Sequence, residues 1–300
     1  MQNNFMQNLR ELKNIRLILT CNIIGLVLLL SLSFTLTVDL WYELDRAVFY
    51  FFNRLLAESG AFLYFTAAVN LTGFYLAAFL LLLAVFYAEY RLTNVEGKRW
   101  FAAIGITALL GALVVKQLAG AFAWSRVSPT TYFDNLYHDA AFVSRLTVWP
   151  VNDALTSCYP DGAGIILLVC CAFFWRYLGR GAFIRALVIT VIFSFFPVMG
   201  GAHWLTDFFI GSLGYVLIFL TWIIFTPLAD TAIDWLEEKL PLDWFEKRRE
   251  SDGPRFTREK LEEKVNFFSA LLHFGAGCFR VVFGLLRTWF NAFLSKYNRK

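Results

Sequence analysis

A histidine and an aspartate stand four residues apart in the stretch FPVMGGAHWLTDFFIG, where an apolar run should continue. At that spacing, His203 and Asp207 would share one face of a helix. The carboxylate can accept a hydrogen bond from one ring nitrogen, which leaves the lone pair of the other nitrogen available. A histidine held in this way is a candidate nucleophile or general base. The pair alone also fits an interfacial histidine beside an aspartate that favours the helix dipole.

Other polar groups are expected on the same side of the protein. Two glycines precede His203, so backbone N–H groups near Gly201 could approach an anion beside a helix N-terminus. Lys116 and Arg126 lie at the end of the third apolar run, and Asp161 precedes the fourth. Ionisable groups at a membrane are functional candidates because they are unfavourable there. The sequence therefore predicts that these groups lie together at one membrane face, with Gly201 placed to bind an anion.

The composition places these residues in a membrane protein. Hydrophobic residues make up 58% of the chain and charged residues 17%, whereas soluble domains carry about 25% charge. The apolar residues form runs of about 20, the length that crosses roughly 30 Å of hydrocarbon as a helix. We expect an all-α integral membrane protein, a bundle of six transmembrane helices, near residues 16–38, 60–88, 101–123, 164–178, 183–199 and 207–226. The first run is too long for a cleaved signal and is expected to be retained.

The distribution of basic residues predicts the orientation. With both termini cytoplasmic, only five of the 27 Lys and Arg residues would face outward, as the positive-inside rule requires. The segments 39–59, 124–163 and 200–206 would then be periplasmic. Residues 41–60 alternate apolar and charged positions at helical spacing, which indicates a helix lying in the interface. The 124–163 segment is a long loop, and such loops are usually functional or disordered.

Residues 1–240 form the predicted membrane domain, and residues 241–300 form a separate cytoplasmic region. That region combines a charged linker with an apolar stretch interrupted by His273, Arg280 and Arg287. A charge at the centre of a span costs about 2.5–3.5 kcal/mol, so an amphipathic helix on the membrane surface is favoured over a seventh span. Its basic end suits anionic lipid, and the region is also a candidate contact for a protein partner.

Several functional classes find no support in the sequence. The five cysteines form no metal-ligand spacing or disulfide framework, and no nucleotide-binding glycine loop is present. We therefore expect no metal and no cofactor. The net charge of +4 reflects the inside-positive topology, so no nucleic-acid partner is expected.

The order of these features resembles the type 2 phosphatidic acid phosphatase superfamily, whose motifs read KxxxxxxRP, PSGH and SRxxxxxHxxxD. The likeness is closest to the lipid A 1-diphosphate synthase branch and runs from about residue 15 to 240. It rests on DRAVFYFFNRLLAESGAFL, RVSPT, FFWRYLGR, VMGGAHWLTDFFIGS and FTPLAD. The resemblance implies a protein of the bacterial inner membrane. It would move phosphate from undecaprenyl diphosphate onto lipid A at the periplasmic face.

The resemblance also implies roles for individual residues. In the third motif, His203 would be the nucleophile that takes the phosphoryl group, and Asp207 would orient it. In the first motif, Lys116 and Arg126 would bind phosphate oxygens, although nine residues separate them here instead of six. The second motif contains a histidine that protonates the leaving group, and Ala163 stands at its position.

A second departure lies in the third motif, where Pro197 replaces an arginine. A general acid typically contributes 10²–10⁴-fold to a rate, and a donor to the developing charge roughly another 10²–10³-fold. His138, Asp161 and Arg145 are candidate replacements. A diphosphate is also a good leaving group that needs less protonation than an alkoxide does.

Two hypotheses follow from this combination. The first is an active phosphotransferase or phosphatase with a phosphohistidine intermediate, which the retained pair of His203 and Asp207 supports. The second is a catalytically inactive relative that binds a lipid head group or a protein partner, which the losses at Ala163 and Pro197 support.

Overall fold

The computed structural model describes residues 2–71, 74–93, 95–124, 126–133 and 159–241. The predicted cytoplasmic region, apart from residue 241, and the candidates His138 and Arg145 lie outside these ranges. Within them, every regular element is a helix, which confirms the predicted all-α class for this part of the chain. The elements are α1 (Gln2–Ser31), α2 (Thr35–Glu58), α3 (Gly60–Val69), α4 (Phe74–Arg91), α5 (Val95–Phe122), α6 (Pro129–Tyr132), α8 (Gly162–Phe173), η1 (Phe174–Leu178), α9 (Arg180–Met199), η2 (Asp207–Ser212), α10 (Leu213–Ile224) and α11 (Leu228–Lys239).

Four described helical stretches are long and apolar enough to cross a membrane: Asn14–Ser31, Gly97–Phe122, Arg180–Met199 and Asp207–Ile224. They correspond to the first, third, fifth and sixth predicted spans. The fourth corresponds to the shorter apolar helix Gly162–Leu178. The total of six spans stays a prediction.

The predicted second span is divided into two helices. Residues 60–88 were expected to be continuous, but α3 ends at Val69 and α4 begins at Phe74. Asn70 follows α3, and its side-chain amide donates to the carbonyl oxygens of Thr66 and Phe196. The second bond ties the end of α3 to α9. Because this tertiary contact involves a residue that apolar composition does not mark, the hydropathy pattern missed the break.

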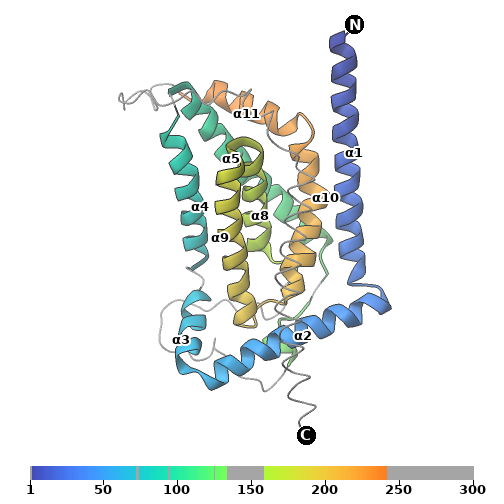
Figure 1. Ribbon diagram of the computed structural model, residues 1–300, viewed down its shortest axis with the longest axis vertical. Helices are drawn as coiled ribbons and strands as arrows, with labels where there is room; N and C mark the ends of the chain where they lie inside the picture. The colour runs from blue at the N-terminus through green and yellow to red at the C-terminus, as the bar shows by residue number, and fades with distance from the viewer. Residues whose placement is uncertain (1, 72–73, 94, 125, 134–158, 242–300) are drawn as a thin grey trace. The chain divides into compact units, whose positions relative to one another are not determined.

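The boundary between the first span and the interfacial helix also differs from the prediction. Helix α1 ends at Ser31, and α2 begins at Thr35 and continues to Glu58. The hydroxyl of Ser59 then caps α3 by accepting from the N–H of Phe62 at 3.3 Å. Helix α2 runs across one end of the bundle (Figure 1). It is amphipathic, and its buried positions include Asp45, Phe49 and Leu56.

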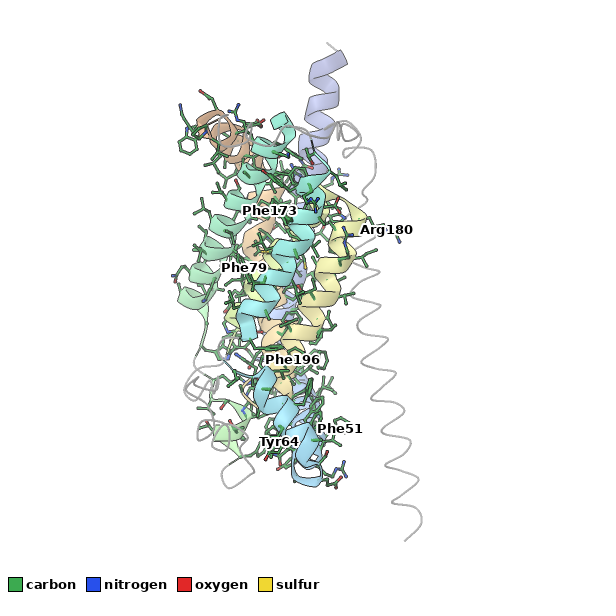
Figure 2. The ribbon with its side chains drawn as sticks, turned by 90° about the vertical axis from the view of Figure 1, so that its left-hand side faces the viewer. Phe51, Tyr64, Phe79, Phe173, Arg180 and Phe196 are labelled. Carbon is green, nitrogen blue, oxygen red and sulfur yellow. The ribbon has the colours of Figure 1, made fainter. Side chains whose placement is uncertain are left out.

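The outer faces of the bundle are apolar and exposed. Figure 2 looks onto α3 and α4, where the side chains of Tyr64 and Phe79 are exposed, whereas Phe173 of α8 is fully buried. Exposed apolar side chains also run along α1, including Leu19 and Ile23. Such faces suit helices whose outer surfaces contact hydrocarbon.

Close packing holds α1 against α10. A Cβ atom on Gly25 would lie 2.7 Å from the carbonyl oxygen of Gly214, so only glycine allows this approach. The side chain of Asn22 adds a hydrogen bond to the hydroxyl of Thr221 at 2.9 Å. Helix α8 packs between α5 and α9 in the centre of the bundle. This packing positions the starts of α8 and η2, which contribute to the candidate site.

Candidate active site

His203 and Asp207 meet at the point where the sixth predicted span begins. His203 lies in the turn after α9, and Asp207 is the first residue of η2. Nδ1 of His203 is 3.3 Å from Oδ2 of Asp207. The expectation that both residues share a helix face is therefore wrong, because the contact spans a turn and the first helical turn. The predicted proximity of the two side chains is nevertheless present.

The Asp207 carboxylate also caps the N-terminus of its own helix. Its Oδ2 accepts from the backbone N–H of Trp204 at 2.8 Å, as the third residue of a capping box does. The Asp207 side chain is fully buried, whereas 10% of the His203 side chain is exposed. The carboxylate is thus more deeply buried than the imidazole, which keeps a small exposed fraction.

The glycine turn in front of His203 has a packing role in the structure. The N–H groups of Gly200, Gly201, Ala202 and His203 all donate to carbonyl oxygens at the end of α9. They do not form the expected row of donors for an anion. Gly201 has φ +74°. A Cβ atom there would lie 2.7 Å from Cγ2 of Thr130 and 2.9 Å from Cε2 of Phe49.

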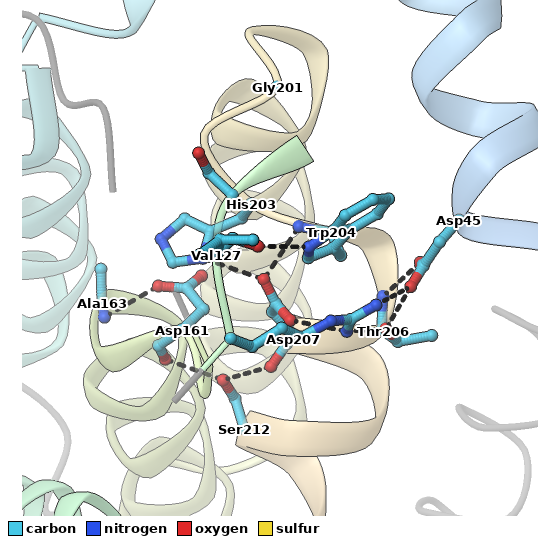
Figure 3. A network of polar contacts seen from close by, with 12 residues as sticks. Asp45, Val127, Asp161, Ala163, Gly201, His203, Trp204, Thr206, Asp207 and Ser212 are labelled. Carbon is cyan, nitrogen blue, oxygen red and sulfur yellow. Dashed lines mark hydrogen bonds and ion pairs between the residues drawn. The ribbon is translucent and has the colours of Figure 1, made fainter. Parts of the chain in front are cut away.

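Figure 3 shows the side chains of His203, Thr206 and Asp207 close together. Arg126 joins this network from the segment between α5 and α6. Its Nη1 donates to Oδ1 of Asp207 at 3.0 Å and to the hydroxyl of Thr206 at 2.7 Å. Its guanidinium carbon lies 4.8 Å from the ring centroid of Trp204, a favourable cation–π geometry. The structure therefore brings Arg126 and His203 to the same carboxylate, as the sequence predicted.

A second buried carboxylate holds the other side of Arg126. Asp45, from α2, accepts from Nη2 of Arg126 at 2.7 Å. It also accepts from the N–H of Thr206 at 3.0 Å and from its hydroxyl at 2.6 Å. Burial raises the pKa of the Asp45 carboxyl above its ordinary value. Arg126 and Thr206 act in the opposite direction, because their donated bonds favour the ionised form.

Asp45 was not among the predicted site residues. Its helix was recognised as interfacial, and the three superfamily motifs do not include it, although the stretch DRAVFYFFNRLLAESGAFL begins at Asp45. One signal was available, because Asp45 stands four residues before Phe49 on the apolar stripe of an amphipathic helix. A carboxylate on such a stripe is buried, and a buried carboxylate requires a partner.

The start of α8 is tied to the same network. Asp161 caps the helix, its Oδ1 accepting from the N–H of Ala163 at 3.0 Å. The hydroxyl of Ser212 donates to the carbonyl oxygen of Asp161 at 2.7 Å and lies 3.1 Å from that of Asp207. Ala163 therefore lies beside the site, at the position where the second motif of the family has its histidine.

Lys116 approaches this helix start from α5. A Cβ atom on Gly162 would lie 3.0 Å from Cε of Lys116 and 3.8 Å from its Nζ. Among the described residues Lys116 makes no salt bridge, and it is exposed. Its ammonium group thus adds to the positive end of the α8 dipole.

The described part of the chain contains no group of three or more His, Cys, Asp or Glu residues that would hold a metal ion. His138 and Arg145, predicted as compensating residues, lie in residues 134–158, outside the described ranges.

Comparison with known proteins identifies the family. No family model and no solved structure matches the chain. Lipid A 1-diphosphate synthase of Escherichia coli (strain K12) is 39% identical over 235 residues, which cover 77% of this chain and 96% of the relative. The chain belongs to the type 2 phosphatidic acid phosphatase superfamily, in its lipid A 1-diphosphate synthase branch.

As a member of this superfamily, the protein departs from the family pattern at two described positions. Pro197 lies inside α9, where the family has an arginine, and its carbonyl oxygen accepts from Ala202 and His203. Ala163 offers no titratable group at the start of α8. The side chains of His203, Asp207 and Arg126 lie together beside these two positions.

Proposed function

We propose that this protein is a lipid phosphotransferase of the bacterial inner membrane that acts on an isoprenoid diphosphate and lipid A phosphate. The observation that carries the proposal is the contact between Nδ1 of His203 and Oδ2 of the buried Asp207. A carboxylate in that position favours the tautomer with the proton on Nδ1. Nε2 then carries the lone pair and is the nitrogen that attacks phosphorus.

The proposed reaction has two displacements. Nε2 of His203 attacks the terminal phosphorus of the diphosphate, and the bond to the bridging oxygen breaks with its electron pair leaving on the lipid monophosphate. A phosphate oxygen of the acceptor lipid then attacks the phosphohistidine, the P–N bond breaks, and the imidazole recovers its lone pair. Asp207 stabilises the positive charge that the ring carries in between.

This substrate pair explains how the protein could work with Ala163 at the second-motif position. The leaving group is a phosphate and the attacking group is already an anionic phosphate oxygen, so neither displacement needs a proton transfer. The relative's name, lipid A 1-diphosphate synthase, describes the formation of such a phosphate–phosphate bond. An alkoxide leaving group, by contrast, would need the missing acid.

Positive charge for binding the substrate phosphates would come from Lys116, from the start of α8 and from Arg126. Lys116 lies against Gly162, at the positive end of the α8 dipole. Arg126 is already bonded to Asp45 and Asp207, so we assign it a smaller direct share. A phosphate-binding role for Gly201 would need its N–H to exchange its present acceptor, the carbonyl of Val198.

We also propose that the site faces the periplasm and that both termini are cytoplasmic. The start of α1, the connection from α4 to α5 and α11 lie at the end of the bundle opposite α2 (Figure 1). The basic residues Arg91, Lys98 and Arg99 lie near that same connection. The positive-inside rule places such residues in the cytoplasm. Contacts of residues 241–300 with anionic lipid or a protein partner belong to this proposal.

A second candidate function is binding of a phosphorylated lipid head group without turnover. The observation that favours it is the simultaneous presence of Ala163 and Pro197, together with the bonding of Arg126 to two carboxylates. In this alternative the His–Asp pair would contact a head group, and the protein would act as a binding or scaffolding module.

A transfer assay with purified protein distinguishes the two functions. Undecaprenyl diphosphate labelled at its terminal phosphate is incubated with lipid A in phospholipid nanodiscs, and both labelled lipid A and inorganic phosphate are measured. The proposal predicts label on lipid A from wild-type protein and none from His203→Ala. Equal results for the two proteins at equal folded concentration would refute the phosphotransferase and leave the binding function.

A further inference from the structure

Asp45 is a buried carboxylate that lies outside the three superfamily motifs. It lies on α2, outside the bundle core, yet its side chain is fully buried against Arg126 and Thr206. Burial of a carboxylate is unfavourable, and the ion pair and hydrogen bonds only offset it. A hydrophobic residue on the same stripe of α2 would pack without that penalty. The position therefore suggests a role for the charge itself.

The two carboxylates hold Arg126 from opposite sides. Nη2 donates to Oδ2 of Asp45 and Nη1 donates to Oδ1 of Asp207, at 2.7 and 3.0 Å. The planar guanidinium is thereby fixed over the ring of Trp204. With Asp45 absent, the pull of one carboxylate on Arg126 would be lost and that of Asp207 would remain. Asp207 would then be drawn toward the guanidinium.

Asp45 also acts directly on the helix that carries Asp207. Thr206 immediately precedes Asp207, and both its N–H and its hydroxyl donate to Asp45. These bonds fix the first turn of the helix relative to α2. Oδ2 of Asp207, which faces Nδ1 of His203, depends on that turn for its position.

We propose that Asp45 is a positioning residue for phosphoryl transfer, which acts through Arg126 and Thr206 to hold Asp207 against the His203 ring. This inference rests on the proposed function. The described bonds of Asp45 go to Arg126 and Thr206 and not to the imidazole, so its loss should impair the chemical step rather than substrate binding. An ionised carboxylate near a phosphate site opposes anion binding, so its removal should not raise KM.

The test compares Asp45→Asn with Asp39→Asn, which removes the same charge from an exposed position of the same helix. In the transfer assay, Asp45→Asn is expected to lower kcat per folded protein by about ten-fold or more, without an increase in KM. Asp39→Asn is expected to match wild type. Values for the two variants that agree within about two-fold would overturn the proposal.

A second readout separates positioning from folding and does not require turnover. Nitrogen NMR of ¹⁵N-histidine-labelled protein reports which ring nitrogen of His203 carries the proton, with the signal assigned from its loss in His203→Ala. The proposal predicts an Nδ1-protonated ring in wild type and Asp39→Asn, and a mixture of tautomers in Asp45→Asn. An unchanged tautomer in folded Asp45→Asn would overturn it, even if wild-type protein transfers no phosphate.

If Asp45→Asn does not fold, Thr206→Val tests the same linkage. Valine preserves the side-chain shape and the backbone N–H but removes the hydroxyl that connects Asp45 with Arg126. The proposal predicts the same change in the His203 tautomer and a similar direction of change in kcat. A wild-type tautomer together with wild-type kcat would overturn it.

Discussion

At the scale of single residues, one carboxylate organises the candidate site. Asp207 faces Nδ1 of His203, accepts from the N–H of Trp204 and pairs with Arg126. His203 and Trp204 contact Oδ2 and Arg126 contacts Oδ1, so both oxygens of the carboxylate are held in place. Such pre-organisation is what a histidine nucleophile requires, because the ring must keep one tautomer during attack.

We propose that the identity of residue 163 determines which leaving groups the protein can use. If the missing acid restricts the protein to phosphate leaving groups, Ala163→His should raise phosphate release from a lipid phosphomonoester. The rise should approach the 10²–10⁴-fold range typical of general acids. Release from the diphosphate should rise much less, because its leaving group needs no proton.

Phosphate release from the two substrates by wild type, Ala163→His and Ala163→Asn measures this difference. Asparagine is the control, because it adds a polar side chain that cannot transfer a proton at neutral pH. Equal gains for both substrates, or a gain with asparagine, would show that residue 163 does not act through protonation. No gain on either substrate would contradict this explanation of the family departure.

At the scale of elements, the sequence predicted which segments meet better than it predicted where each helix begins and ends. The proximity of His203, Asp207 and Arg126 followed from motif order, and the central helices followed from apolar length. The break between α3 and α4 was not predicted, because the apolar pattern does not reveal the bond from Asn70 to the Phe196 carbonyl. Asp45 was missed for the same reason, since its partners lie far away in sequence.

The turn between α9 and η2 depends on contacts from two other elements. Thr130 of α6 donates its N–H to the carbonyl oxygen of Gly201 at 3.2 Å, and Phe49 of α2 packs against the same glycine. We expect Gly201→Ala to destabilise the protein by about 1–3 kcal/mol, because it combines a positive φ with two steric conflicts. The loss should extend to activity, since His203 is two residues away.

Thermal unfolding in detergent measures this effect, and Gly181→Ala is the matched control. Gly181 lies in the first turn of α9 with nothing within 4 Å of an added Cβ atom. Alanine there should be neutral or slightly stabilising, because it has the higher helix propensity. Indistinguishable unfolding of the two variants would contradict the packing described for the turn.

At the scale of the whole molecule, the site and the basic segments lie at opposite ends of the described bundle (Figure 1). Helix α2 covers the site end and contributes Asp45 to it. The proposed function requires this arrangement. A lipid phosphate at the periplasmic surface of the inner membrane would then reach the imidazole without leaving the bilayer. The sequence predicted this separation of the site from the basic segments from the distribution of Lys and Arg, through the positive-inside rule. The orientation in the membrane stays a prediction.

The central claim is that His203 carries the phosphoryl group, and trapping the intermediate tests it most directly. Purified protein is mixed with terminally labelled undecaprenyl diphosphate without acceptor, quenched in base and digested for mass spectrometry. We expect an acid-labile phosphate on His203 in wild type, a strongly reduced amount in Asp207→Asn and none in His203→Ala. The absence of phosphate from His203, or an equal amount of label on another residue in the His203→Ala protein, would contradict it.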